Sequence, residues 1–196
     1  MKKYIPLAFL LCIVTAVSCD RGNPRSETLL EEGWKFSLGD FEAASSPAFD
    51  DSQWEEVCVP HDWAIYGQFD ESNDIEVFSF QQGDETITSS MTGRTGGLPH
   101  VGVGWYRNTF DLRSLDKERQ SVSLLFDGAM SGAQVWVNGT KVISWPSGYN
   151  SFHCDITQWL NDDGQENIIA VRLENLPHSS RWYPGAGLYR NVRIIK

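Results

Sequence analysis

Two segments far apart in the chain combine aromatic and charged side chains in a way that suits recognition of a small polar ligand. Residues 59–63 read Val-Pro-His-Asp-Trp, and residues 180–190 read Ser-Arg-Trp-Tyr-Pro-Gly-Ala-Gly-Leu-Tyr-Arg. Each sets an aromatic ring beside a charged group at the end of a strand-like run. A sugar offers one apolar C–H face and a rim of hydroxyls, which match an aromatic face beside a fixed hydrogen-bonding charge. Carbohydrate is therefore the predicted ligand class.

The residues of these segments also have structural interpretations. Asp62 could simply cap the turn after Pro60, because aspartate readily bonds nearby backbone in turns. Trp182 and Tyr183 are the better candidates for exposed stacking, since they lie between Arg181 and a Pro-Gly pair in a predicted loop. Large aromatics elsewhere in the chain are expected inside the core, namely Trp54, Trp105 and Trp136. Two strand arginines that follow aromatics, Arg107 and Arg190, are expected to form ion pairs or to stack on rings.

From Gly33 onward, short β-type runs alternate with turn residues. The predicted strands are residues 34–38, 55–59, 104–111, 121–127, 133–137, 141–145, 152–155, 167–174 and 188–195. Asn138-Gly139 supplies the positive-φ pair of a tight hairpin turn. The one helical turn expected covers residues 155–160, with Asp155 as its N-cap. This pattern predicts an all-β fold, an antiparallel jelly-roll β-sandwich.

The stretch from about residue 67 to residue 102 breaks the rhythm of strands. It is rich in Gly, Ser, Thr and Asp, and it is predicted to be one long loop. Loops of this length in a compact domain are usually functional or disordered. We expect this one to lie against a binding cleft or a neighbouring domain, with plain disorder as the alternative.

The N-terminus has the features of an export signal. Residues 1–3 are Met-Lys-Lys, and the apolar run over 5–17 is shorter than the roughly 20 residues that a spanning helix needs. Residues 16–19, Ala-Val-Ser-Cys, resemble a bacterial lipobox in which Cys19 becomes lipidated; ordinary cleavage with Cys19 incidental is the alternative. The expected organisation is a lipoprotein-type signal over 1–18, a polar tether over 19–28 and one domain over 29–196. The protein is expected to be exported, as a periplasmic or outer-membrane or cell-surface lipoprotein.

Charge and cysteine content exclude several classes of partner. The 196-residue chain has a formal net charge of −10 at pH 7. An acidic surface repels phosphate backbones, so no nucleic-acid partner is predicted.

Cys58 and Cys154 are too few for a disulfide scaffold and are predicted to be buried free thiols, with a disulfide between them as the alternative. No cofactor and no metal site are predicted; His153 and Cys154 are neighbours in a strand and point to opposite faces.

Five segments, taken in order, resemble the N-terminal sugar-binding domain of glycoside hydrolase family 2, the β-galactosidase and β-glucuronidase family. They are Phe-Asp-Asp-Ser-Gln-Trp leading to Val-Pro-His-Asp-Trp at 49–63, Gly-Trp-Tyr-Arg at 104–107, Asp-Gly-Ala and Val-Trp-Val-Asn-Gly within 127–139, Gly-Tyr before Phe at 148–152, and 181–190. They span nearly the whole predicted domain. Residues 95–105, Thr-Gly-Gly-Leu-Pro followed by Gly-Val-Gly-Trp, are most similar to β-galactosidases of gut-type Gram-negative bacteria.

The resemblance implies a galactose-binding-like sandwich that, in full-length members, precedes an immunoglobulin-like domain and a catalytic TIM barrel. It also implies that Asp62 and the loop of Arg181 and Trp182 reach the active site of the barrel and bind the non-reducing sugar. The chain stops at Lys196, where the first domain of the family would end, so the barrel and its two catalytic glutamates are expected to be absent. A retaining glycosidase needs two carboxyl groups about 5–5.5 Å apart. Nothing in the spacing of the acids here pairs them, and no catalytic residue is predicted.

The sequence therefore predicts the carbohydrate-binding domain of a β-galactosidase-like enzyme, inactive alone, with Asp62, Arg181 and Trp182 as substrate-binding residues. Its partners would be a β-galactoside-like carbohydrate, immunoglobulin-like and TIM-barrel domains in cis or in trans, and a membrane through lipid on Cys19. Two alternatives stay open. One is a free-standing carbohydrate-binding surface lipoprotein, and the other is a non-catalytic protein-interaction module.

Overall fold

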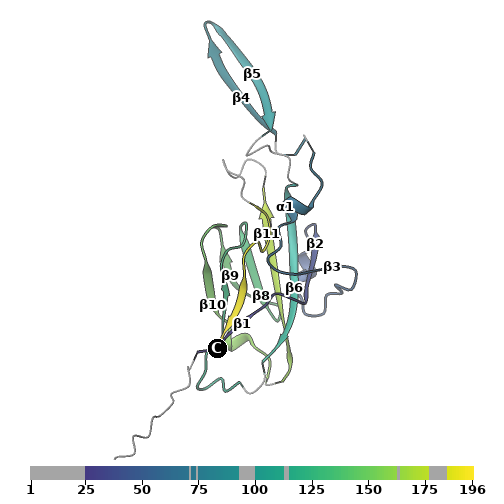
Figure 1. Ribbon diagram of the computed structural model, residues 1–196, viewed down its shortest axis with the longest axis vertical. Coiled ribbons are helices and arrows are strands. Elements are labelled where there is room, and N and C mark those ends of the chain that lie inside the picture. The colour runs from purple at the N-terminus through teal and green to yellow at the C-terminus, as the bar shows by residue number, and fades with distance from the viewer. Residues whose placement is uncertain are drawn as a thin grey trace, which may run out of the picture.

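The computed structural model describes residues 25–70, 72–73, 75–92, 100–112, 115–162, 164–176 and 185–196. In this part of the chain the strands form a six-stranded sheet, a four-stranded sheet and a separate two-stranded hairpin (Figure 1). All the strand pairs are antiparallel. The predicted antiparallel β-sandwich is confirmed.

The six-stranded sheet has the order β3-β2-β6-β11-β8-β9. Its two long central strands pair over their whole length, so that Tyr106 lies opposite Val171. The strands are β2 Trp34–Leu38, β3 Glu55–Val57, β6 Gly102–Asp111, β8 Ala133–Val137, β9 Thr140–Trp145 and β11 Glu166–Asn175.

The four-stranded sheet has the order β1-β12-β7-β10. Its strands are β1 Glu27–Leu29, β7 Ser123–Phe126, β10 Phe152–Asp155 and β12 Val192–Ile195. Because the first and last strands pair here, the two ends of the domain lie side by side, with Glu27 opposite Ile195.

Alternating side chains of the two sheets form the main core. Tyr106, Val171 and Val135 occupy paired positions on neighbouring strands of the six-stranded sheet, and all are buried. Leu124 and Phe126, two residues apart on β7, are buried in the same cluster. Each such aliphatic or phenyl side chain contributes about 1.5–3 kcal/mol on burial. The core thereby fixes the sheets and leaves the connections at their ends to form a site.

A second apolar cluster lies on the outer face of the six-stranded sheet, beneath the 3-10 helix η1 (Glu42–Ser45). Trp105 is buried there and stacks on Trp136, with ring centroids 5.1 Å apart. Trp136 and Trp54 are only half-buried. The expectation that all three tryptophans lie inside is therefore correct for Trp105 and too strong for the other two, because short η1 covers only part of this face.

Each of the nine predicted strands has a counterpart, and three match to the residue: β2, β8 and β10. The predicted tight turn after β8 is present, with φ of +49° at Asn138 and +83° at Gly139. Strand β1 begins at Glu27, two residues before the predicted start of the domain at 29. All three of its residues are exposed, so they carry no alternating pattern that could have revealed a strand.

The helical turns differ in part from the prediction. The turn expected over 155–160 is a 3-10 helix, η2 (Thr157–Trp159), whose N-cap is Ile156 and not Asp155 as predicted. The Asp155 side chain still accepts a hydrogen bond from the Thr157 N–H at 2.9 Å. A four-residue helix that was not predicted, α1 (Trp63–Tyr66), follows Asp62. It is too short to show helical periodicity in the sequence.

The predicted long loop of residues 67–102 is a correction, because it contains a β-hairpin. Strands β4 (Ile75–Gln82) and β5 (Glu85–Thr92) pair with each other and extend away from the sandwich beyond α1 (Figure 1). The two-residue turn between them has Gly83 at φ +64°, a conformation that glycine adopts at no steric cost. Apolar residues at 75, 77, 78 and 80 occupy both faces of β4, which hides the alternation of a strand.

Cys58 and Cys154 are both free thiols. The predicted burial is wrong for Cys58, which is exposed after the end of β3, and holds only in part for Cys154. In the ranges described above, no helix combines the length and apolar character needed to cross a bilayer.

Candidate functional site at the junction of residues 61–64 and 185–188

The two segments singled out in the sequence meet in the structure. The His61 N–H donates to the Leu188 carbonyl at 2.8 Å, and the Trp63 N–H donates to the Ala186 carbonyl at 3.1 Å. These bonds join parts of the chain more than 120 residues apart. We call residues 61–64 and 185–188 together the junction.

Asp62 links the two sides of the junction through its side chain. Its Oδ1 accepts from the Ala64 N–H at 3.0 Å, which makes it the N-cap of α1, and from the Ala186 N–H, also at 3.0 Å. The structural interpretation of Asp62 as a cap is therefore correct. It does not exclude ligand binding, because a carboxylate has about four acceptor sites.

Glycines allow the backbone on the far side of the junction to approach this closely. A Cβ added to Gly185 would lie 3.0 Å from Asp62 Oδ2, and one added to Gly187 would lie 2.6 Å from the His61 carbonyl oxygen. Both residues have positive φ, +69° and +112° respectively. Glycine is thus required at both positions by space and by conformation.

At the junction, half-buried His61 forms a polar pair with buried Tyr106. Its Nδ1 lies 2.7 Å from the Tyr106 hydroxyl, and its ring stacks on Tyr66 with centroids 5.7 Å apart. Burial lowers the pKa of His61, although Glu55 and Asp62 oppose the shift. Burial also raises the pKa of Tyr106 well above its usual range. Both rings are therefore neutral near pH 7, and they position the junction without adding charge.

A cavity of about 500 Å³ opens beside the junction. His61 and Trp63 line it together with residues of β2, β3 and α1, including Phe36, Glu55 and Tyr66. Asp62, which lies between His61 and Trp63 in the sequence, does not line the cavity; its side chain accepts from the Ala186 N–H. The aromatic rings of this cavity, together with the Glu55 carboxylate, suit a small amphipathic ligand such as a sugar.

Arg181 and Trp182 lie outside the described residues, and so does Cys19. In the sequence, Arg181 and Trp182 come four and three residues before Gly185. Gly185 itself packs against Asp62. The convergence of Asp62 with Arg181 and Trp182 at one edge of the sandwich stays a prediction.

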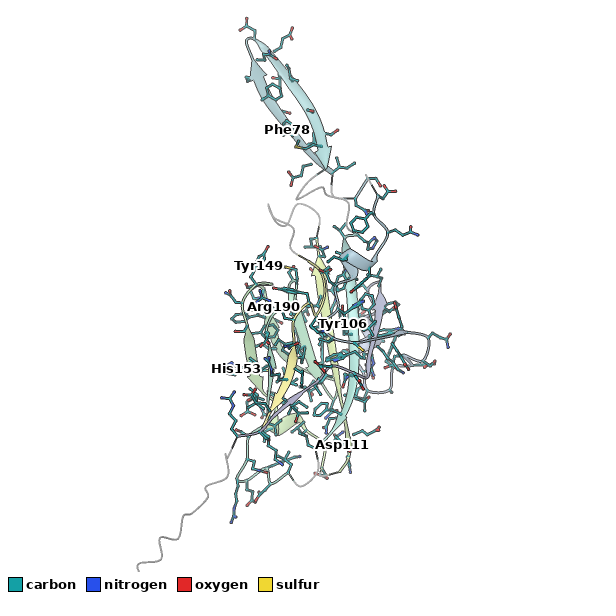
Figure 2. The ribbon with its side chains drawn as sticks, in the orientation of Figure 1. Phe78, Tyr106, Asp111, Tyr149, His153 and Arg190 are labelled. Carbon is teal, nitrogen blue, oxygen red and sulfur yellow. The ribbon has the colours of Figure 1, made fainter. Side chains whose placement is uncertain are left out.

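Arg107 and Arg190 have the structural roles predicted for them, although Arg190 precedes β12 (Val192–Ile195) and is not itself in a strand. Arg107 is buried, pairs with Asp51 (Nε to Oδ2, 2.7 Å) and lies over the Phe49 ring. Arg190 lies over the Tyr189 ring at 5.1 Å from its centroid. Figure 2 shows Arg190 and Tyr149 near the same end of the sandwich, where Arg190 donates to the Tyr149 carbonyl at 3.2 Å. These arginines stabilise the fold around the site.

The carboxylates that could have been considered for catalysis have structural partners. Asp127 receives Arg193 Nη1 on both oxygens at 2.6 Å, and Glu174 pairs with Arg172. Glu71 lies outside the described residues. In the part of the chain that the structure describes, no group of three or more His, Cys, Asp or Glu side chains could hold a metal.

Comparisons with known proteins agree with this architecture. A family model described as the glycosyl hydrolase 2 galactose-binding domain-like family matches residues 103–182. β-Galactosidase BoGH2A from Bacteroides ovatus is 37% identical over 175 residues, which are 89% of this chain and 18% of that protein. A β-glycosidase structure from Bacteroides vulgatus has a TM-score of 0.69 at 34% identity, covering 86% of this chain and 20% of that one. The Bacteroides uniformis β-glucuronidase structure has a TM-score of 0.66 at 26% identity, covering 87% and 18%.

The antiparallel sandwich and its matched segments define a galactose-binding-like domain. The chain belongs to glycoside hydrolase family 2, as an N-terminal domain of that family. The resemblance noted in the sequence is thus confirmed. The chain spans about a fifth of the length of the relatives that it matches.

Sequence reasoning missed part of the junction. The Ala186 N–H, the glycines on either side of it and the Tyr106 hydroxyl all contribute to the geometry around Asp62. Two glycines within four residues of a Trp-Tyr pair were the available signal. They indicate close backbone approach, although not which segment approaches.

Proposed function

We propose that this domain binds the non-reducing sugar of a β-galactoside-like substrate within a family 2 glycosidase, acting together with further domains that carry the catalytic groups. The observation that carries the proposal is the junction. It brings the Asp62 carboxylate into contact with Gly185 and Ala186, which follow Arg181 and Trp182 closely in the sequence.

The chemistry of these groups fits a sugar. Asp62 carries a carboxylate that can accept from hydroxyls beyond the two backbone N–H groups already bound. Arg181 would donate to ring or hydroxyl oxygens, and Trp182 would cover the apolar C–H face. The named relatives include both a β-galactosidase and a β-glucuronidase. We favour a galactoside because of the resemblance of residues 95–105.

The test is a fused enzyme in which residues 25–196 replace the matched region of BoGH2A. Hydrolysis of an aryl β-galactoside is measured for this enzyme and for Asp62→Asn, which keeps an oxygen for the Ala64 and Ala186 N–H groups but removes the charge. Hydrogen bonds to charged groups contribute about 1.5–3 kcal/mol, so kcat/KM should fall about 10- to 100-fold. Trp182→Ala should lower it as well.

The matched control is Asp116→Asn, an exposed aspartate in a turn far along the chain, which should leave kcat/KM unchanged. An active enzyme whose kcat/KM is the same with Asp62→Asn and Trp182→Ala would remove the proposed sugar site. The isolated 196-residue chain should hydrolyse no aryl glycoside.

The second candidate function is a carbohydrate-binding lipoprotein that acts alone, and the cavity of about 500 Å³ beside His61 favours it. Calorimetric titration of the isolated chain with galactosides separates the two. A half-site open to water should bind weakly, because affinity for small ligands depends on burial. Submillimolar affinity lost on Tyr66→Ala would favour the second candidate.

We also propose that the protein is exported and anchored through lipid on Cys19. The support is the Ala-Val-Ser-Cys sequence at 16–19 and the polar residues that follow it. Cys19→Ala should move the protein from the detergent phase to the aqueous phase on partitioning. A wild-type protein already in the aqueous phase, and beginning at another residue, would contradict the anchor.

A further inference from the structure

The β4–β5 hairpin has one strongly apolar face. Phe78 and Phe80 are alternate residues of β4, and their rings stack with centroids 6.4 Å apart. Phe80 pairs directly with Ile87, and Met91 lies on the same side opposite Glu76. We call Phe78, Phe80, Ile87 and Met91 the hairpin face. Figure 2 shows Phe78 on the part of the hairpin that extends beyond the sandwich.

The opposite side of the hairpin is mostly polar. Ser79 bonds Thr88 through their hydroxyls at 2.9 Å, and Gln81 donates to the Thr86 hydroxyl at 2.6 Å. Ile75 and Val77 are the exceptions, two apolar residues near the base that are 41% and 68% exposed. The hairpin therefore distinguishes its two sides, as a sheet does when only one of them is to be covered.

The hairpin face is left uncovered by the sandwich. Phe78, Phe80 and Met91 are 41%, 47% and 57% exposed, and the two strands form a sheet of their own. An isolated two-stranded hairpin is marginally stable in water and needs a further apolar surface against one side. A contiguous exposed apolar patch of this kind marks an interaction site.

The charge of this region selects the kind of partner. Residues 66–92 contain six acidic residues and no lysine or arginine. Glu76 and Glu85 project on the same side as the hairpin face, at its two ends. Anionic membranes and a second copy of the hairpin would be repelled, whereas an apolar protein surface bordered by lysine or arginine would be attracted.

We propose that the hairpin face docks on such a surface of another domain of the same glycosidase. This inference rests on the proposed function, in which the domain acts with further domains. The relatives supply about four-fifths of their length outside the matched region, which leaves ample protein for this contact. The hairpin would then hold the sugar-binding edge in place, since β4 is the next element of the chain after α1, which begins within the junction.

Hydrogen exchange of residues 75–92 tests the contact. It is measured in the isolated 196-residue chain and in the enzyme made by fusing residues 25–196 to the remaining domains of BoGH2A. Docking should slow exchange at least tenfold in the fused enzyme. Phe78→Ser/Phe80→Ser should abolish the added protection, and the matched control Val77→Ser, on the other side of β4, should retain it.

A charge variant keeps the test valid if the serine variant disrupts the hairpin itself. Glu76→Lys/Glu85→Lys leaves the apolar side chains in place and should reduce the added protection at least threefold. The control Asp116→Lys should not. If exchange slows instead in the isolated chain as its concentration rises, the occupant is a second copy and the proposal is wrong.

Aryl galactoside hydrolysis separates this inference from the proposed function. A fused enzyme that hydrolyses the substrate while its hairpin exchanges as fast as in the isolated chain overturns the docking and leaves the sugar-binding proposal intact. The opposite outcome is also distinguishable. If the hairpin is protected in the fused enzyme but Asp62→Asn leaves hydrolysis of the aryl galactoside unchanged, the docking stands and the sugar-binding proposal is overturned.

Discussion

The junction, which includes the first residues of α1, and the β4–β5 hairpin, which follows α1 in the chain (Figure 1), use apolar residues in opposite ways. At the junction, Trp63, Ala186 and Leu188 are buried and the backbone is held by hydrogen bonds between distant segments. In the hairpin, two phenylalanines are exposed and the hydrogen bonds are between neighbouring strands. The junction is thus part of the folded core, whereas the hairpin presents apolar surface to a partner.

This difference means that substitutions in the two regions should have separate effects. A change at the junction should lower the free energy of unfolding, because the removed or added atoms lie against buried groups. A change on the hairpin face should leave that free energy almost unaltered and act on assembly. Four substitutions or conditions, from the largest expected effect to the smallest, test this separation.

Gly187→Ala should be the most damaging change. Gly187 has φ +112°, and an added Cβ would press on the Tyr106 hydroxyl and lie 2.6 Å from the His61 carbonyl oxygen. Strain and overpacking together should cost about 3 kcal/mol or more. Urea unfolding measures it. The control Gly164→Ala also has positive φ, +75°, but meets nothing within 4 Å, and should cost only about 1 kcal/mol. Equal losses would show that the junction is not tightly packed.

Asp62→Ala should lower the free energy of unfolding by about 1–2 kcal/mol, because it removes the cap of α1 and the acceptor of the Ala186 N–H. Asp62→Asn retains an acceptor oxygen and should lose less than half as much in the same urea titration. If the two variants lose equally, the charge and not the hydrogen-bond geometry holds the junction.

The sequence predicted the sandwich well wherever one face of a strand is buried. Val135 and Val137 alternate with Trp136, and this local pattern is enough to define β8 to the residue. Strand β1 was not predicted, because its formation depends on pairing with β12 at the other end of the chain. Local alternation can be seen in a sequence, whereas pairing over such a distance depends on the completed fold.

The candidate site was predictable only in part for the same reason. Asp62 could be singled out as a ligand residue or as the cap of the turn after Pro60, because a short carboxylate can accept from a ligand hydroxyl or from nearby backbone N–H groups. Its bond to Ala186 crosses 124 positions of sequence and needs the sandwich to be formed first. The hairpin was missed because Val77 and Phe78, adjacent residues on opposite faces, break the period of two.

Acid should weaken the junction in a way that depends on His61. Burial lowers the pKa of His61 from its ordinary value of about 6.5, so the folded state binds this proton less well than the unfolded state. The stabilisation is therefore complete above about pH 6.5 and is lost as pH falls through the lowered pKa. Urea unfolding between pH 8 and pH 5 should show the decline, smaller than the loss of the Asp62 cap.

The pH effect has a matched control on β10, in the four-stranded sheet. His61→Asn should flatten this part of the pH profile, whereas His153→Gln, at an exposed position of β10 labelled in Figure 2, should leave it unchanged. A profile that keeps its slope in His61→Asn would assign the acid sensitivity to the carboxylates of the chain instead.

The smallest effect on folding is expected for Phe78→Ser/Phe80→Ser. Both rings are 40–50% exposed and pack against each other, not against the sandwich core, so the free energy of unfolding of the isolated chain should change by less than about 0.5 kcal/mol. Far-ultraviolet circular dichroism and urea unfolding measure this. A loss comparable to that of Asp62→Ala would mean that the hairpin supports the fold, and the division between a core junction and a docking hairpin would then fail. An unchanged stability, together with loss of hairpin protection in the fused enzyme, requires that the phenylalanines serve an interface rather than the core.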